Sequence, residues 1–409
     1  MKRFVGILLV MLGFAAAVSA QPASVKVKKY GAAPLRFSSV EEWEYIHRPI
    51  IFNYFQNEVY GRVPECQVSV LYDRMRVDVA LGGKAICRQV AMHVEGMPTP
   101  ILVVIYLPAK ASGPVPIFLG ANFSGNNQIT TDEFVIISEN APRGSELKSK
   151  LDRGSSVARW PLEMIIDAGY AVATFYRGDV DPDFDDGFQN GVHPSFYRNG
   201  QTAPAANEWG TIGAWAWALS RVMDYLETDE DIDATRVAVF GHSRLGKTAL
   251  WAGACDPRFA LVISNDSGCT GAALSIRKHG ETVAKINKSF PHWFCDNYNK
   301  YSDNEEALFV DQQGLIALIA PRPVYIASAT LDDWADPEGE YLSALYASPV
   351  YELYGKKGLT SKTMPQPDSP VNDGSVAYHI RTGKHNITAY DWEQYIKFAN
   401  RHFGICQTR

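Results

Sequence analysis

Short, continuous apolar runs, each followed by a loop and a helical segment, dominate the chain from residue 101 onward. The runs are Ile101 to Leu107, Val115 to Leu119, Ala171 to Phe175, Val237 to Phe240, Leu261 to Ser264 and Val324 to Ala327. Continuous apolar runs separated by helices are typical of strands buried on both faces of a parallel sheet. The pattern predicts an α/β fold, with helices covering both faces of a mostly parallel central sheet in three layers.

The region before residue 101 follows a different pattern. Two runs alternate between apolar and polar residues, Val68 to Val79 and Ile86 to Val94, and predict antiparallel strands at one edge of the sheet. Helical spacing of apolar residues predicts a helix within Glu41 to Tyr60. The same spacing predicts a helix over Thr211 to Leu226, leading into the Val237 run, and a closing helix over Asp391 to Phe403.

The first 20 residues have the three parts of a secretory signal peptide. Lys2 and Arg3 precede an apolar run from Val5 to Val18, and Ala20 provides a small residue for cleavage. The run is shorter than the roughly 20 apolar residues that a membrane-spanning helix needs. We therefore expect export to the periplasm or the medium, no membrane attachment after cleavage, and a single catalytic domain over residues 21–409, since no low-complexity linker divides the chain.

Composition narrows the choice of partner. The net charge is −6 and there is no basic run, which argues against nucleic acid or an anionic membrane and favours a small or neutral ligand. The chain has six cysteines, whose spacing selects no disulfide pattern, so bridges and free thiols both remain open. Neither C-x-x-C nor H-E-x-x-H occurs, so we expect no metal site.

The run Val237 to Phe240 leads directly into a candidate nucleophile turn. Gly241 and Ser243 follow the strand, and helix-forming residues come next. A sharp strand-to-helix turn exposes a serine hydroxyl and aims backbone N–H groups at the developing oxyanion. The usual G-x-S-x-G pattern is shifted here, because Leu245 holds the second glycine position and Gly246 comes one residue later. An ordinary turn is the alternative for this motif alone.

Chain order supports the catalytic interpretation. In α/β-hydrolases the acid and then the histidine follow the serine, each after a later strand. His385 lies in a polar, glycine-containing loop just before the closing helix, where this fold carries its base. His379 is the competitor, but it sits at the end of a possible strand, Val376 to Ile380, where we expect a structural histidine.

Two loops offer the acid that would orient the histidine. Asp332 and Asp333 follow the run Val324 to Ala327, and Asp266 follows the preceding run. Either could instead be a turn residue or a helix cap.

A second group of aspartates, residues 179–187, alternates in a way that could suit calcium. It lacks the glycine and terminal glutamate of an EF-hand loop, so we expect a solvated, turn-rich loop.

The serine segment 241–247, G-H-S-R-L-G-K, resembles the motif G-x-S-R-x-G-K of the glucuronoyl esterases, carbohydrate esterase family 15. The resemblance runs from about Val115 to the C-terminus and is strongest in residues 241–247, 265–268, 290–294, 332–337 and 383–385. Fungal members carry cysteines beside the serine and the histidine, where this chain has His242 and Asn386, which indicates a bacterial-type member. Asp266 stands where fungal members place the glutamate of the triad; its shorter side chain raises the standing of Asp332, and both stay candidates for the acid.

The resemblance implies roles for residues that the triad leaves unexplained. It implies Arg244 at the oxyanion, Lys247 and Glu281 on sugar hydroxyls, and Trp334 against the sugar ring, with His292 and Trp293 completing that wall. Without it, aromatic core packing and a solvated Lys247 are the expectation.

The implied activity is that of a serine esterase cleaving the ester between (4-O-methyl)glucuronic acid of glucuronoxylan and lignin alcohols through a covalent acyl-enzyme. No cofactor is implied, and we expect a monomer acting on a uronic-acid-bearing polysaccharide or its lignin ester. The alternatives are an acetylxylan-type or other carbohydrate esterase on the same fold, because the fold does not identify the acyl group, and an inactive carbohydrate-binding relative.

Overall fold

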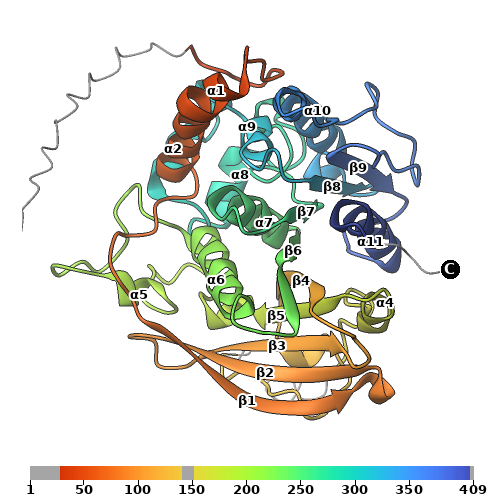
Figure 1. Ribbon diagram of the computed structural model, residues 1–409. Coiled ribbons are helices and arrows are strands. Elements are labelled where there is room, and N and C mark those ends of the chain that lie inside the picture. Colours follow the sequence, from red (N-terminus) through yellow and green to blue (C-terminus); the bar gives the residue numbers. More distant parts are fainter. Residues whose placement is uncertain (1–27, 141–151, 406–409) are drawn as a thin grey trace, which may run out of the picture.

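The computed structural model describes residues 28–140 and 152–405, so the expected signal peptide lies outside the described residues. In these two ranges, no helix is both long and apolar enough to cross a membrane. Nine strands of the described chain form one sheet in the order β1-β2-β3-β5-β4-β6-β7-β8-β9 (Figure 1). They are β1 (Val70–Ala80), β2 (Ala85–Val94), β3 (Ile101–Pro108), β4 (Val115–Asn122), β5 (Ala171–Tyr176), β6 (Ile232–His242), β7 (Leu261–Asn265), β8 (Val324–Ala329) and β9 (Val376–Arg381).

Every run expected to be a strand forms one, but one direction was predicted wrongly. Strands β4 to β9 are parallel, and β1 and β2 are antiparallel edge strands as expected. Strand β3 is antiparallel to both β2 and β5, although its pattern resembled that of the parallel strands. Its side chains are buried on both faces, so the apolar run carries no sign of direction. The short connection 109–114 brings the chain back at the same end of the sheet, which makes β3 run opposite to β4.

Helices cover both faces of the sheet, which gives the expected three layers (Figure 1). Along β6, Val237 and Val239 pack into a core with one set of helices, while Ala238 and Phe240 pack into a second core on the other face, as the two-residue period of a strand requires. The first set is α2 (Arg48–Glu58), α6 (Thr211–Leu226), α7 (Arg244–Cys255), α9 (Gln312–Ala317) and α10 (Pro337–Leu353), and the second is α4 (Leu162–Asp167) and α11 (Ala389–Phe403). The helix expected within Glu41 to Tyr60 forms as α1 (Val40–Glu42), a π-helical turn η1 (Trp43–His47) and α2. Two further helices are short, α5 (His193–Phe196) and α8 (Val283–Ser289).

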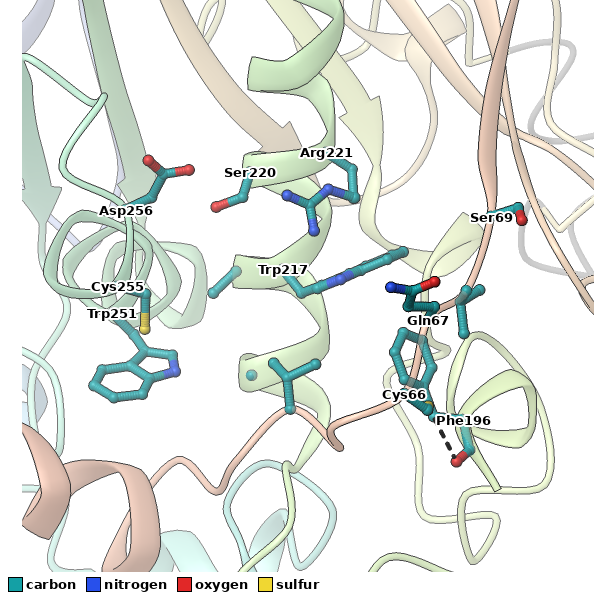
Figure 2. A pocket seen from close by; sticks show the side chains of 14 residues that line it. Cys66, Gln67, Ser69, Phe196, Trp217, Ser220, Arg221, Trp251, Cys255 and Asp256 are labelled. Atoms are coloured by element: carbon teal, nitrogen blue, oxygen red, sulfur yellow. Dashed lines mark hydrogen bonds between the residues drawn. The ribbon is translucent and has the colours of Figure 1, made fainter. Parts of the chain in front are cut away.

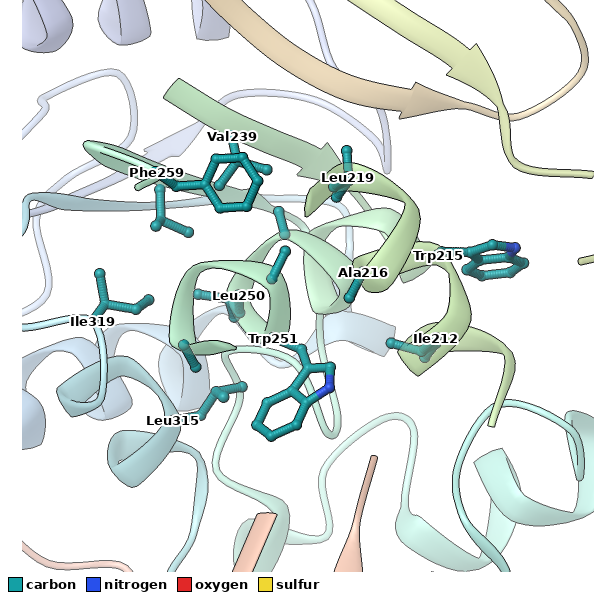
Figure 3. Close-up of a cluster of buried hydrophobic side chains, with 14 of the residues drawn as sticks. Ile212, Trp215, Ala216, Leu219, Val239, Leu250, Trp251, Phe259, Leu315 and Ile319 are labelled. Carbon is teal, nitrogen blue, oxygen red and sulfur yellow. The ribbon is translucent and has the colours of Figure 1, made fainter. Parts of the chain in front are cut away.

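The packing of α6 on α7 fixes the helix that begins at the candidate nucleophile. Ala216 and Leu219 of α6 lie with Leu250 and Trp251 of α7 in one buried cluster (Figure 3). The Trp251 ring also stacks on Tyr60, with ring centroids 4.7 Å apart. Truncation of such a buried tryptophan costs about 3–5 kcal/mol of stability, so this cluster holds α7 firmly against the sheet.

The five cysteines within the described residues are free thiols, namely Cys66, Cys87, Cys255, Cys269 and Cys295. Of the two possibilities left open by the sequence, the described part of the chain therefore takes the unbridged one.

Candidate active site

The candidate catalytic residues gather at the carboxyl ends of neighbouring parallel strands. Ser243 directly follows β6, Asp266 follows β7, Asp332 follows β8, and His385 follows β9. In α/β sheets this edge is where ligands bind, because the loops after successive parallel strands meet there.

The turn at Ser243 has the geometry of a nucleophile elbow. Ser243 has φ 58° and ψ −129°, a strained conformation for a non-glycine residue. A Cβ atom at Gly241 would lie 1.9 Å from the carbonyl oxygen of Leu245, so this position accepts only glycine. At Gly246 a Cβ atom would lie 3.0 Å from the Ser264 Oγ, because α7 passes close to the end of β7. The shifted second glycine therefore serves helix packing.

The start of α7 leaves backbone donors for an oxyanion. The N–H groups of Gly246 and Lys247 donate back to the Ser243 carbonyl oxygen at 2.8 and 3.2 Å. Arg244 is the first residue of α7, and the first N–H groups of a helix have no partner within it. The Arg244 N–H follows the nucleophile directly, where this fold places an oxyanion donor.

His385 is paired with Asp332. The imidazole Nδ1 lies 2.5 Å from Asp332 Oδ2, and Asp332 is buried while 42% of the His385 side chain is exposed. A carboxylate accepts from Nδ1–H, which leaves Nε2 without a proton in the neutral ring and able to act as a base. The ring of His385 also lies 4.5 Å from that of His242, the residue just before Ser243.

Asp266 lies near this pair but differs from Asp332 in its hydrogen-bond partner and in its pKa. Its Oδ2 accepts from the Asn386 N–H at 3.2 Å, and its Oδ1 has no partner within the described chain. Burial, followed by the charges of Glu340 and Asp332, raises the pKa of Asp266 well above its usual value, which favours its protonated form. Possible ligand atoms of Asp266, Asp332 and His385 lie within 4.8 Å of one another, the single such group among the described residues.

His379, the competing base, is structural as expected. It is fully buried, its Nδ1 lies 3.0 Å from the Tyr325 hydroxyl, and its Nε2 lies 2.9 Å from Asp391 Oδ1. Both ring nitrogens are therefore occupied inside the protein.

Three of the expected sugar-binding residues form one cluster. Lys247 is 3% exposed, and its ammonium donates to the carbonyl oxygens of Ser267 and Cys269 at 2.5 Å and to Glu281 Oε2 at 3.4 Å. The Glu281 N–H donates to the Trp334 carbonyl oxygen at 3.0 Å. Trp334 is 54% exposed, which excludes the alternative that it is a core residue. The solvated helix face considered for Lys247 is also excluded.

His292 and Trp293 lie elsewhere than expected. Both residues are buried. Trp293 Nε1 donates to Asp183 Oδ1 at 2.7 Å, and His292 Nε2 lies 3.1 Å from the same oxygen. One face of the Trp293 ring stacks on Phe290, and the Arg244 guanidinium lies 4.6 Å from its centroid. The Phe290 and Trp293 rings pack against the Arg244 guanidinium, so Trp293 presents no free face to a sugar.

Asp183 is the residue of this site that the sequence analysis missed. The sequence predicts a solvated loop here, and this prediction is wrong: the Asp183 side chain is 6% exposed, and Asp179 and Asp181 are buried. Asp181 accepts from the Thr211 hydroxyl at 2.5 Å. Asp183 pairs with Arg244 and, at 2.9 Å, with Arg177. No local pattern could reveal a partner 61 residues away.

A cavity of about 640 Å³ lies away from these residues. It runs along α6 and the last turns of α7, where Trp217, Trp251 and Cys255 line it (Figure 2). Ser243 is at the opposite end of α7, and none of the expected catalytic or sugar-binding residues lines this cavity.

Comparison with known proteins agrees with this geometry. The family model of the fungal glucuronyl esterases matches residues 156–355. A carbohydrate esterase from an unknown prokaryotic organism is 48% identical over 376 residues, 90% of this chain and 87% of the relative. The solved glucuronoyl esterase from Solibacter usitatus is 44% identical with a TM-score of 0.86, over 93% of this chain and 100% of that one. This chain belongs to carbohydrate esterase family 15, the glucuronoyl esterases.

Membership makes the protein a carboxylic ester hydrolase with the α/β-hydrolase fold. A second solved relative, a promiscuous family 15 esterase from a marine bacterial metagenome, is 47% identical with a TM-score of 0.81, over 89% of this chain and 93% of that one. A 4-O-methyl-glucuronoyl methylesterase from the fungus Wolfiporia cocos is 31% identical over 66% of this chain and 67% of the relative. The greater similarity to the bacterial proteins agrees with the bacterial type indicated by His242 and Asn386.

Proposed function

We propose that this glucuronoyl esterase hydrolyses the ester between the carboxyl group of (4-O-methyl)glucuronic acid on glucuronoxylan and a lignin alcohol, through a covalent acyl-enzyme. The observation that carries the proposal is the pairing of His385 with Asp332 beside the strained turn of Ser243. The family relatives named as 4-O-methyl-glucuronoyl methylesterases support the choice of acyl group.

Ser243 Oγ attacks the uronoyl carbonyl carbon while His385 Nε2 takes the hydroxyl proton. The charge that develops on the carbonyl oxygen is stabilised by the Arg244 backbone N–H and by its guanidinium. His385 then gives the proton to the departing alcohol oxygen, which leaves the glucuronoyl group on Ser243. Water attacks this ester with His385 again as base, the acid is released, and the Ser243 hydroxyl is restored.

The cluster of Lys247, Glu281 and Trp334, beside Asp332, binds the sugar. Trp334 offers an exposed ring face, on which a sugar ring stacks through its C–H groups. Glu281 accepts from a sugar hydroxyl. Lys247 donates to one by exchanging its contact with Glu281, which at 3.4 Å is the longest and weakest of its three contacts.

The test is hydrolysis of three esters by the protein: the benzyl ester of glucuronic acid, the methyl ester of galacturonic acid and p-nitrophenyl acetate. A kcat/KM clearly highest for the glucuronate ester is expected. Cleavage of p-nitrophenyl acetate alone would keep the serine esterase and reject the uronate specificity. The Ser243→Ala variant serves as control, because residual hydrolysis by it would contradict the acyl-enzyme.

A further inference from the structure

The group that holds the Arg244 guanidinium is a carboxylate buried behind it. Arg244 Nη1 donates to Asp183 Oδ2, and the Arg244 side chain is 25% exposed while that of Asp183 is 6% exposed. A guanidinium has five N–H donors in a rigid plane, so one contact with Asp183 orients the rest. Its Nε is buried without a hydrogen-bond partner in the described chain, so Asp183 supplies the charged contact and the Phe290 and Trp293 rings supply the packing.

Asp183 is itself held by groups that are largely buried. Trp293 Nε1 and His292 Nε2 lie 2.7 and 3.1 Å from Oδ1, and Arg177 lies 2.9 Å from Oδ2. The Arg177 guanidinium is held in turn over the Trp215 ring, 5.2 Å from its centroid. The carboxylate is therefore anchored on its inner side, and Arg244 is its outermost partner.

Charge explains why this position needs an acid. Arg177 and Arg244 would repel each other without a carboxylate between them. Burial opposes ionisation of Asp183, but the His292 contact, the two arginine charges and the Trp293 N–H outweigh it and hold the pKa of Asp183 well below its usual value. The carboxylate therefore stays charged, and able to pair with Arg244, at neutral pH.

We propose that Asp183, anchored by Trp293, His292 and Arg177, is a positioning residue that holds the Arg244 guanidinium at the oxyanion. It touches no reacting atom and acts through Arg244. The inference rests on the proposed function of Arg244, and it extends the site to a loop between β5 and α6 that carries none of the triad. Preorganised donors contribute to catalysis because they need no reorganisation during the reaction.

The test uses Asp183→Asn, which keeps the shape and removes the charge. We expect kcat to fall about 10- to 100-fold with little change in KM, less than the roughly 100- to 1000-fold loss when an oxyanion donor is removed outright. Asp185→Asn, an exposed acid of the same loop, is the matched control and should leave kcat unchanged. An unchanged kcat in Asp183→Asn would overturn the proposal.

A double variant separates positioning from a general structural role. In an Arg244→Gln background, Asp183→Asn should cost nothing further, because residues that act as one unit are not additive. An equal loss in both backgrounds would show that Asp183 acts independently of Arg244, against the proposal. If Asp183→Asn does not fold, Trp293→Phe removes one anchor while keeping the stacking on Phe290, and kcat should still fall.

The choice of substrate keeps the two proposals distinguishable. Arg244 would serve the oxyanion of any ester, so the effect of Asp183→Asn is measured on p-nitrophenyl acetate as well as on the benzyl ester of glucuronic acid. Loss on both esters supports the role of Asp183 even if the wild-type protein shows no preference for the glucuronate ester.

Discussion

His385 Nδ1 lies 2.5 Å from Asp332 Oδ2, and these two residues come from the loops after adjacent parallel strands, β9 and β8. Asp266, from the loop after β7, stays close to both but is bonded to the Asn386 backbone instead. Two carboxyl groups therefore lie near one imidazole, and only one of them is placed to orient it.

This arrangement predicts unequal effects of two matched substitutions. Asp332→Asn should lower kcat at least about 100-fold, because the carboxylate that sets the tautomer and stabilises the imidazolium is lost. Asp266→Asn should change kcat little, since the contact of Asp266 is with the Asn386 N–H, from which an amide oxygen can still accept. Steady-state kinetics of both variants on one ester decides the matter, and the reverse order would assign the acid to Asp266.

Trp334→Ala should weaken binding of the uronate without unfolding the protein. Its ring is 54% exposed, so its removal costs little stability, while loss of a stacking partner should raise KM about 5- to 10-fold, an effect of roughly 1 kcal/mol. Tyr45→Ala, an 81% exposed aromatic on η1, is the control for loss of an exposed ring. Equal KM values for the wild-type protein and Trp334→Ala would remove Trp334 from the sugar site.

Glu340 makes the stability of the fold depend on pH. Burial raises its pKa to about 7, against the hydrogen bonds from the Ser328 hydroxyl and the Gly268 N–H, and the Asp332 charge adds to the rise. The folded state therefore holds this proton more tightly than the unfolded state, whose value is 4.5. The stabilisation is complete below pH 4.5 and is lost as the pH rises through 7.

The measurement is the free energy of unfolding of wild-type protein and Glu340→Gln between pH 4.5 and 7. Relative to the wild type, Glu340→Gln should gain on the order of 3 kcal/mol across this window, at about 1.4 kcal/mol for each pKa unit. Glu352→Gln, on the exposed side of the same helix α10, should parallel the wild type. Parallel curves for Glu340→Gln would show that Glu340 does not take up a proton on folding.

The elbow itself makes a steric prediction. Gly241→Ala places a Cβ atom 1.9 Å from the Leu245 carbonyl oxygen, so the turn must open, with an expected loss of about 3 kcal/mol or more in the free energy of unfolding. Gly246→Ala meets its nearest atom only at 3.0 Å and should be milder. Thermal denaturation ranks the two, and a more severe Gly246→Ala would contradict the argument.

Much of this arrangement follows from local patterns in the chain. The strands were predictable because buried runs such as Val237 to Phe240 leave a direct hydrophobic signal, and chain order then placed Ser243, Asp332 and His385 at one edge of the sheet. The direction of β3 was not predictable, because a strand buried on both faces has the same apolar sequence pattern whether it is parallel or antiparallel to its neighbours. The burial of Lys247 was not predictable either, because the carbonyl oxygens that accept from its ammonium lie in a loop about 20 residues later.

Asp183 illustrates the same limit in the active site. An aspartate in a loop rich in aspartate, glycine and proline usually faces solvent. Its burial depends on Arg177, Arg244, His292 and Trp293, which reach it from three separate segments, and no spacing in the chain encodes that meeting.

The free thiols bear on how the enzyme can be produced. With Cys66, Cys87, Cys255, Cys269 and Cys295 unbridged, no covalent link between any two of them has to form before the sheet and the site assemble. A chain expressed from residue 21 onward should therefore fold in the reducing cytosol of a bacterial host without a disulfide isomerase, and dithiothreitol in the storage buffer should not harm it.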